Sequence, residues 1–233
     1  MSKQVVTTQD LRELPAYSIA EAAGYLRLPK STLRAWLIGQ PYRVGEMQRF
    51  FQPVIEIADA KHRSLSFINL VEAFVLGGLR RKHTVPLGKV RKAVEYVRKH
   101  FNSKRPLAEE QFETDGVDLF VRKFGELIGA SQEGQQMMES MLRQRLKLVK
   151  RDPAGVPEKL VLFPAPRQKK NSAAVIIDPR ISFGRPVLDG LGVRTGVLAE
   201  RFIAGDMLGE LARDYGASPE AIENAIRCEL RAA

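Results

Sequence analysis

The amino-acid sequence predicts a mainly α-helical protein with small β-hairpins, an α+β fold. Apolar residues recur at helical spacing through most of the chain, and short β-branched and aromatic runs interrupt the helical segments. Of the 233 residues, 44% are hydrophobic, which is typical of a globular core. The longest apolar stretch, residues 70–79, is too short to cross a membrane. Because the N-terminus also lacks the apolar core of a secretory signal, we expect a cytoplasmic protein.

Charge is distributed unevenly along the chain, whose net charge is +10. Residues 1–100 carry a net charge of +9, residues 101–170 carry +3 and residues 171–233 carry −2. One interpretation is a basic module that binds polyanions, joined to a neutral or acidic module with another role. The other is that basic helices have solvated faces. Charge alone leaves both open.

The first predicted elements are two helices joined by a tight turn. Ser18 and Glu21 form a capping-box pattern at the start of the first helix. Residues 27–29 form the turn, and residues 30–37 form the second helix, whose apolar face predicts that it packs back on the first. At this spacing Trp36 is more often a core residue than a stacking platform for nucleic acid. The arrangement is a helix-turn-helix.

The exposed face of the second helix predicts contact with DNA. Backbone N–H groups and hydroxyls bind phosphates, whereas arginine reads base edges in the major groove. The candidate residues on this face are Lys30, Ser31, Thr32 and Arg34.

A β-hairpin is predicted next, from strands 49–55 and 64–67 joined by a basic tip at residues 59–63. A hairpin after a helix-turn-helix is a wing, which reaches flanking phosphates or the minor groove. Two amphipathic helices follow at residues 68–81 and 87–100. The further predicted DNA contacts are Arg43, Arg49, Lys61, His62 and Arg63.

The middle region, residues 106–164, is predicted to be a small α+β extension that packs on the wing domain or pairs two chains. Residues 112–121 suggest a hairpin with Asp115-Gly116 at its turn. A helix over residues 137–150 and a strand over residues 160–163 follow. Prolines and a polar run then predict a linker at residues 165–172.

The tail is predicted to form three helices, at residues 197–204, 207–215 and 219–230. The last two have helix-turn-helix spacing, so a second DNA reader is conceivable. However, Glu220 and Glu223 would face phosphates there, which opposes binding. We therefore favour a protein-binding tail.

Both ends of the chain resemble known families. The order helix, helix, wing, helix, helix, with the motifs at residues 17–23 and 31–36, resembles the MerR-type winged-helix domain. Arg27 stands where such turns often have glycine, and Pro29 where a serine cap is usual. The tail resembles the family called domain of unknown function 433, which implies a homeodomain-like helical domain. Its matching motifs are Asp178-Pro179, Gly184-x-Pro186-Val187, Arg194-Thr195, Gly205-Asp206 and Tyr215-Gly216.

Together the two ends resemble a VapB-type antitoxin, whose partner is a PIN-type ribonuclease toxin. The resemblance implies that residues 1–105 bind the operon's own promoter as a repressor and that residues 173–233 bind the toxin. Because such DNA readers bind two half-sites, we expect a homodimer. A basic side chain can block an acidic metal site, so we expect the tail to use cations. The candidate partner contacts are Arg180, Phe183, Arg185, Arg194 and Thr195.

Two other classes of function stay open: a MerR-like regulator whose C-terminal half senses a ligand or another protein, and an enzyme. The glycines at residues 190–196 depart from a dinucleotide-binding fingerprint. The histidines lie roughly 20 residues apart, without the spacing of metal ligands. No nucleophile motif accompanies Asp178 and Asp189. We therefore expect no cofactor, no metal and no enzymatic activity.

Overall fold

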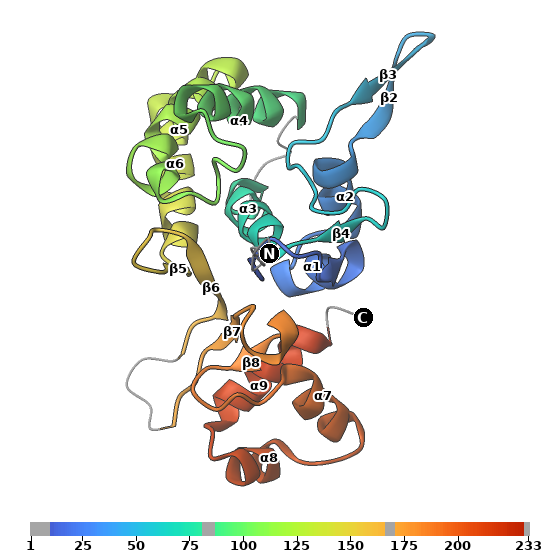
Figure 1. Cartoon of the computed structure of the whole chain (residues 1–233), viewed down its shortest axis with the longest axis vertical. Coiled ribbons are helices and arrows are strands. Elements are labelled where there is room, and N and C mark those ends of the chain that lie inside the picture. The colour runs from blue at the N-terminus through green and yellow to red at the C-terminus, as the bar shows by residue number, and fades with distance from the viewer. Residues whose placement is uncertain (1–9, 81–86, 166–170, 231–233) are drawn as a thin grey trace, which may run out of the picture.

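A computed structural model describes residues 10–80, 87–165 and 171–230. The helix-turn-helix, the hairpin and helices α3–α6 lie at one end of the long axis, and helices α7–α9 lie at the other (Figure 1). One buried hydrophobic cluster extends from Tyr17 in the first element to Cys228 in the last helix. The two ends therefore share a core.

The helix-turn-helix is confirmed as α1 (Ile19–Leu26) and α2 (Lys30–Ile38). The N–H of Glu21 donates to Ser18 Oγ at 3.2 Å, and the Glu21 carboxylate accepts from the Ser18 N–H at 2.9 Å. Arg27 ends α1 with a φ of 55°, in the left-handed region that favours glycine. The predicted apolar face of α2 is buried, Trp36 included.

The hairpin exists, but its predicted strands were wrong. Strands β2 (Gln40–Val44) and β3 (Met47–Phe51) pair with each other directly after α2. Strand β4 (Ser64–Leu65) pairs instead with β1 (Tyr17–Ser18). The chain leaves the sheet after β3 because the N–H groups of Val54 and Ile55 both donate to the Trp36 carbonyl, at 2.7 and 3.0 Å.

The next two predicted helices are confirmed as α3 (Phe67–Gly77), extended by the 3₁₀ turn η1 (Gly78–Arg80), and α4 (Leu87–Phe101). The last predicted residue of the first helix, Arg81, lies outside the described residues. Every residue of α3 is buried, so this helix forms the centre of the N-terminal part.

The hairpin predicted over residues 112–121 was wrong, because this segment is helical. A π-helical turn, η2 (Phe112–Gly116), leads directly into α5 (Val117–Ile128). Phe112, Phe120 and Phe124 are buried and their rings contact one another, so core packing overrides the turn tendency of Asp115-Gly116. The following helix is confirmed as α6 (Gln132–Leu146) and ends four residues before the predicted end.

A four-stranded antiparallel sheet connects the middle region to the tail. Its strands, in the order β5-β6-β7-β8, are Val149–Arg151, Pro157–Phe163, Val175–Ile177 and Val187–Leu188. The predicted strand 160–163 is confirmed as part of β6. Strands β6 and β7 flank the predicted linker and pair with each other. Residues 166–170 of that linker lie outside the described residues, and the predicted domain boundaries stay a prediction.

The three tail helices are confirmed as α7 (Thr195–Ile203), α8 (Leu208–Tyr215) and α9 (Pro219–Glu229). Ser218 caps α9 by accepting from the Ala221 N–H at 3.2 Å. Helix α9 packs against α7, α8 and α1. In the described ranges, no helix is long and apolar enough to cross a membrane.

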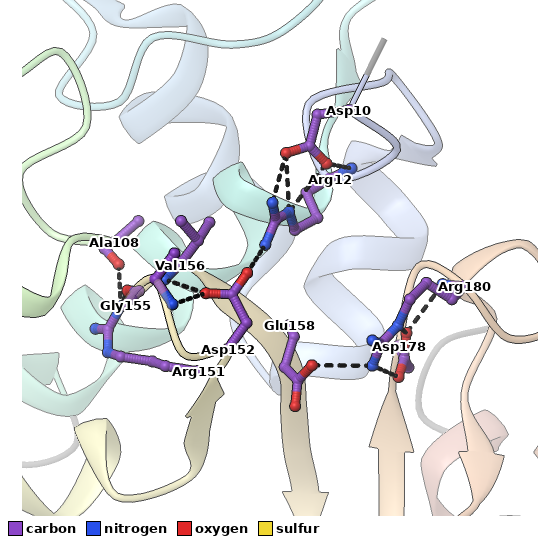
Figure 2. A network of polar contacts seen from close by, with 11 residues as sticks. Asp10, Arg12, Ala108, Arg151, Asp152, Gly155, Val156, Glu158, Asp178 and Arg180 are labelled. Carbon is purple, nitrogen blue, oxygen red and sulfur yellow. Dashed lines mark hydrogen bonds and ion pairs between the residues drawn. The ribbon is translucent and has the colours of Figure 1, made fainter. Parts of the chain in front are cut away.

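Polar networks fix the N-terminal segment and the sheet (Figure 2). Arg12 contacts Asp10 at 2.8 Å and Asp152, in the turn between β5 and β6, at 2.6 Å. The hydrogen bond from Arg12 holds the pKa of Asp152 below its usual value. Arg180 bridges Asp178 and Glu158, at 2.7 and 3.2 Å, beside strands β7 and β6.

Candidate nucleic-acid interface and partner surface

The start of α2 presents an exposed polar face. Lys30, Ser31 and Arg34 are exposed, and no side chain caps the helix at Pro29. The first N–H groups of a helix attract phosphate because they and the helix dipole are positive. Such a surface can bind the backbone of a nucleic acid and place Arg34 against it.

Thr32 does not belong to this face, which corrects the sequence prediction. Only 4% of it is exposed, and Oγ1 has no hydrogen-bond partner in the described part of the chain. Thr32 lies one turn before Trp36, so helical geometry places both on the core side. The polar character of Thr32 misled the prediction.

The β2–β3 hairpin extends from the end of α2 away from the rest of the molecule (Figure 1). Tyr42 pairs with Arg49, and Arg43 with Gln48, so the two arginines project from opposite faces. Both are exposed. The rings of Tyr42 and Phe51 stack at 3.9 Å and stiffen the base of the hairpin. A ribbon exposed on both faces can insert between two phosphate strands.

Lys61, His62 and Arg63 are exposed, but they do not form the tip of this hairpin. They belong to a small turn closed by the bridge between Asp59 and Ser64. The Asp59 carboxylate contacts His62 Nδ1 at 2.7 Å and accepts from the His62 N–H at 3.0 Å. These hydrogen bonds lower the pKa of Asp59. The chain therefore has two separate basic projections near α2.

In the tail, a strained turn displays an aromatic side chain. Ser182, Phe183 and Gly184 are consecutive left-handed residues, with φ of 49°, 55° and 73°. Phe183 is 94% exposed. The Tyr17 hydroxyl donates to the Gly184 carbonyl at 2.9 Å, and a Cβ on Gly184 would lie 2.2 Å from Tyr17 Oη. Only glycine fits there, and the hydrogen bond from Tyr17 joins the turn to β1.

The other predicted partner residues divide into exposed and structural ones. Arg180 and Arg194 are exposed, but Asp178 and Glu158 already pair with the Arg180 guanidinium. Arg185 contacts Glu21 at 2.5 Å and so joins the tail to α1. Thr195 is fully buried, donates to the Pro186 carbonyl at 3.1 Å and contacts Glu229. It cannot touch a partner, because its side chain is buried and its hydroxyl is bound within the chain.

The joint between tail and helix-turn-helix was not predicted. It consists of the Arg185–Glu21 pair and the Tyr17–Gly184 hydrogen bond, between residues more than 160 positions apart. Burial raises the pKa of the neighbouring Tyr25 to about 12. The sequence around Glu21 explains this residue as a helix cap. No pattern near it indicates that Arg185 is its second partner. Within the described ranges, no group of three or more potential ligands could hold a metal ion.

Comparison with protein families divides the chain in the same way. Residues 15–94 match a family described as "Putative DNA-binding HTH domain", and residues 175–227 match "Protein of unknown function (DUF433)". The chain thus carries a helix-turn-helix domain at its N-terminal end and a DUF433 domain at its C-terminal end. The helix-turn-helix at the N-terminal end and the DUF433 resemblance at the C-terminal end are confirmed.

Relatives cover nearly the whole chain. "Putative antitoxin VapB45" of Mycobacterium tuberculosis is 28% identical over 92% of this chain and 93% of its own. The uncharacterized protein Rv2308 of the same organism is 27% identical over 95% of this chain and 92% of its own. The crystal structure of Rv2018, also from M. tuberculosis, superposes with a TM-score of 0.64 at 24% identity, covering 92% and 98% of the chains. That likeness concerns the fold.

Proposed function

We propose that this protein is the antitoxin of a type II toxin–antitoxin module. Its helix-turn-helix binds and represses its own promoter in the cytoplasm, and its DUF433 domain binds and neutralises a PIN-type ribonuclease toxin. The observation that carries the proposal is the exposed, cationic start of α2 beside an exposed basic hairpin. Similarity to VapB45 along nearly the full length supports the toxin-binding half.

On DNA, α2 would lie in the major groove with Arg34 at a base edge, while Lys30 and Ser31 contact phosphates. Arg43 and Arg49 would contact the two backbones that flank the hairpin, because they project from its opposite faces. Lys61, His62 and Arg63 would contact phosphates further out. Two copies of the chain would occupy two half-sites, which makes a homodimer part of the proposal.

On the toxin, Phe183 would fill an apolar socket. A left-handed non-glycine residue costs on the order of 1–3 kcal/mol, and such strain is concentrated at ligand clamps and functional sites. Because internal hydrogen bonds already fix the turn, docking Phe183 loses little conformational freedom. Arg180 and Arg194 would face carboxylates of the toxin, whose metal site is acidic.

Two substitutions separate the two activities. Arg34→Ala should weaken binding to the upstream DNA by about 1–3 kcal/mol and leave toxin capture unchanged. Phe183→Ala should weaken toxin capture by about 2 kcal/mol or more and leave DNA binding unchanged. Fluorescence anisotropy with labelled DNA and a pull-down with the neighbouring gene's PIN-type product measure these.

Arg122→Ala is the control, because Arg122 is exposed on α5, away from both surfaces. It should change neither activity. If Arg34→Ala and Arg122→Ala bind DNA alike, α2 is not the reader. If Phe183→Ala captures the toxin as wild type does, the strained turn is not the docking site.

A further inference from the structure

A cavity of about 500 Å³ lies where α2, the segment after β3 and α4 meet. Its wall is mostly apolar and comes from the last turn of α2 and from residues 53–57. Arg98 of α4, Arg63 and Glu56 add charged groups, and Ala60 completes the lining. The volume falls within the range of about 300–1,000 Å³ that is usual for small-molecule sites.

The guanidinium of Arg98 is only partly satisfied. One of its terminal nitrogens donates to the Val54 carbonyl over a long 3.4 Å, and its buried Nε has no hydrogen-bond partner among the described residues. A buried N–H without an acceptor costs about 1–3 kcal/mol, and more on a charged group. Arg98 also lines the cavity, so an anion bound there can lie against its guanidinium.

The acidic groups near Arg98 are Glu72 and Glu56, and Arg98 itself lowers the pKa of Glu72 electrostatically. Glu72 is buried in α3, where Asn69 and Arg105 contact its carboxylate at 3.3 and 3.4 Å. Burial raises the pKa of Glu72 to about 7, so much of it is uncharged at neutral pH. The Glu56 side chain is exposed to solvent. Neither carboxylate forms an ion pair with Arg98 within the part that the structure describes.

Arg63 supplies a second cation from a strained position. Its φ is 56°, although it is not a glycine. Strain of this kind persists where the surrounding structure fixes it, and it is common at ligand-binding sites. The cavity thus combines an aliphatic wall with two guanidinium groups.

We propose that this cavity binds a small organic anion, consisting of an apolar body and one carboxylate or sulfonate. The anionic group would lie against the guanidinium of Arg98 and face Arg63, and the body would contact the aliphatic wall. The site goes beyond the proposed function, because a small anion is neither DNA nor a toxin, although it shares Arg63 with the proposed DNA contacts. It borders the point where the N–H groups of Val54 and Ile55 donate to the Trp36 carbonyl, between α2 and the segment after β3.

The test uses the full chain and the fluorescent anion 8-anilinonaphthalene-1-sulfonate. Wild type should bind one molecule per chain saturably, and 4-phenylbutyrate should displace it. Arg98→Met keeps the apolar stem but removes the charge, and Ala60→Trp fills the cavity. Each should weaken binding at least tenfold. Arg122→Met, a charge loss on the exposed face of α5, should bind as wild type does.

Several outcomes would overturn the proposal. One is wild type without a saturable site. Another is equal weakening by Arg98→Met and Arg122→Met, which would indicate diffuse attraction to a basic protein. A third is full binding by Ala60→Trp, because a tryptophan at this lining position would occupy the cavity. Displacement by inorganic phosphate as effective as that by 4-phenylbutyrate would mean that the site takes phosphate and not an apolar anion.

Discussion

At the scale of single residues, Gly184 and Tyr17 show how the tail is positioned. Gly184 has a φ of 73°, and its missing side chain leaves room for the Tyr17 hydroxyl. The strained turn that displays Phe183 therefore depends on a contact made from the other end of the chain.

Gly184→Ala should destabilise the protein more than a matched substitution elsewhere. Gly190 has a similar φ of 78°, but a Cβ there would meet nothing within 4 Å. Gly190→Ala should lose about 1 kcal/mol through the left-handed backbone alone, and Gly184→Ala should lose roughly 1–3 kcal/mol beyond that. Urea unfolding measures both. Equal losses would show that the Tyr17 side chain moves aside without lowering the free energy of unfolding.

Glu72 should make stability fall as the pH rises. Its folded-state pKa, about 7, lies above the value of 4.5 for an exposed glutamate. Between these values the folded protein binds more protons than the unfolded chain, so stability is greatest below pH 4.5 and is lost toward pH 7. The loss is at most about 3 kcal/mol.

Glu72→Gln, which cannot ionise, should remove this part of the pH dependence. The comparison is the free energy of unfolding of both proteins between pH 4.5 and 7.5. Parallel curves for wild type and Glu72→Gln would show that Arg105 and Asn69 keep the carboxylate charged throughout.

At the scale of elements, none of the described side chains of the hairpin β2–β3 is buried, and we propose that it contributes electrostatic contacts to DNA. Substituting both Arg43 and Arg49 by alanine should lower the slope of log affinity for DNA against log salt by about 2, because each phosphate contact contributes about 0.9. Thermal stability should not change, since both residues are exposed. The measurement is DNA binding over a series of salt concentrations.

The matched control removes two arginines elsewhere, Arg122 on α5 and Arg213 on α8, both exposed. It changes the net charge equally but should leave the slope as in wild type. If both double variants lower the slope alike, the hairpin acts only through net charge.

Helices with strong periodicity could be predicted from the sequence, and weakly patterned strands could not. Ser18–Glu21 and the face of Leu33, Trp36 and Leu37 defined α1 and α2, and the structure confirms both. Residues 112–121 were misread because Asp115-Gly116 is a strong turn signal, which the packing of Phe112 overrides. Strand β2 is hard to predict because it contains Pro41, and proline within a sheet is confined to edges, strand starts and bulges.

Contacts between residues distant in sequence could not be predicted, because local patterns do not indicate a distant partner. The carboxylate of Glu21 has a complete local explanation as a cap, and nothing near it in sequence indicates Arg185. The prediction of the site residues had the same limit. Residue type suggested Lys30, Ser31, Arg34 and Phe183, which are exposed and stay candidates. The burial of Thr32 and Thr195 depends on which face each helix turns to the core.

At the scale of the whole molecule, charge and architecture agree. The net charge of +9 on residues 1–100 coincides with the exposed α2 and hairpin, and the acidic tail carries the protruding Phe183. The two ends share one core and are linked by Arg185 with Glu21 and by Tyr17 with Gly184. In the proposed function, such a chain presents one surface to DNA and another to a second protein at the same time.

The most direct test of this account is the ribonuclease activity of the neighbouring gene's PIN-type product, titrated with the full-length chain. We predict that activity falls to background when the two proteins are equimolar, and that Phe183→Ala requires a large excess for the same effect. Undiminished activity at a tenfold excess of the wild-type chain would contradict the antitoxin function.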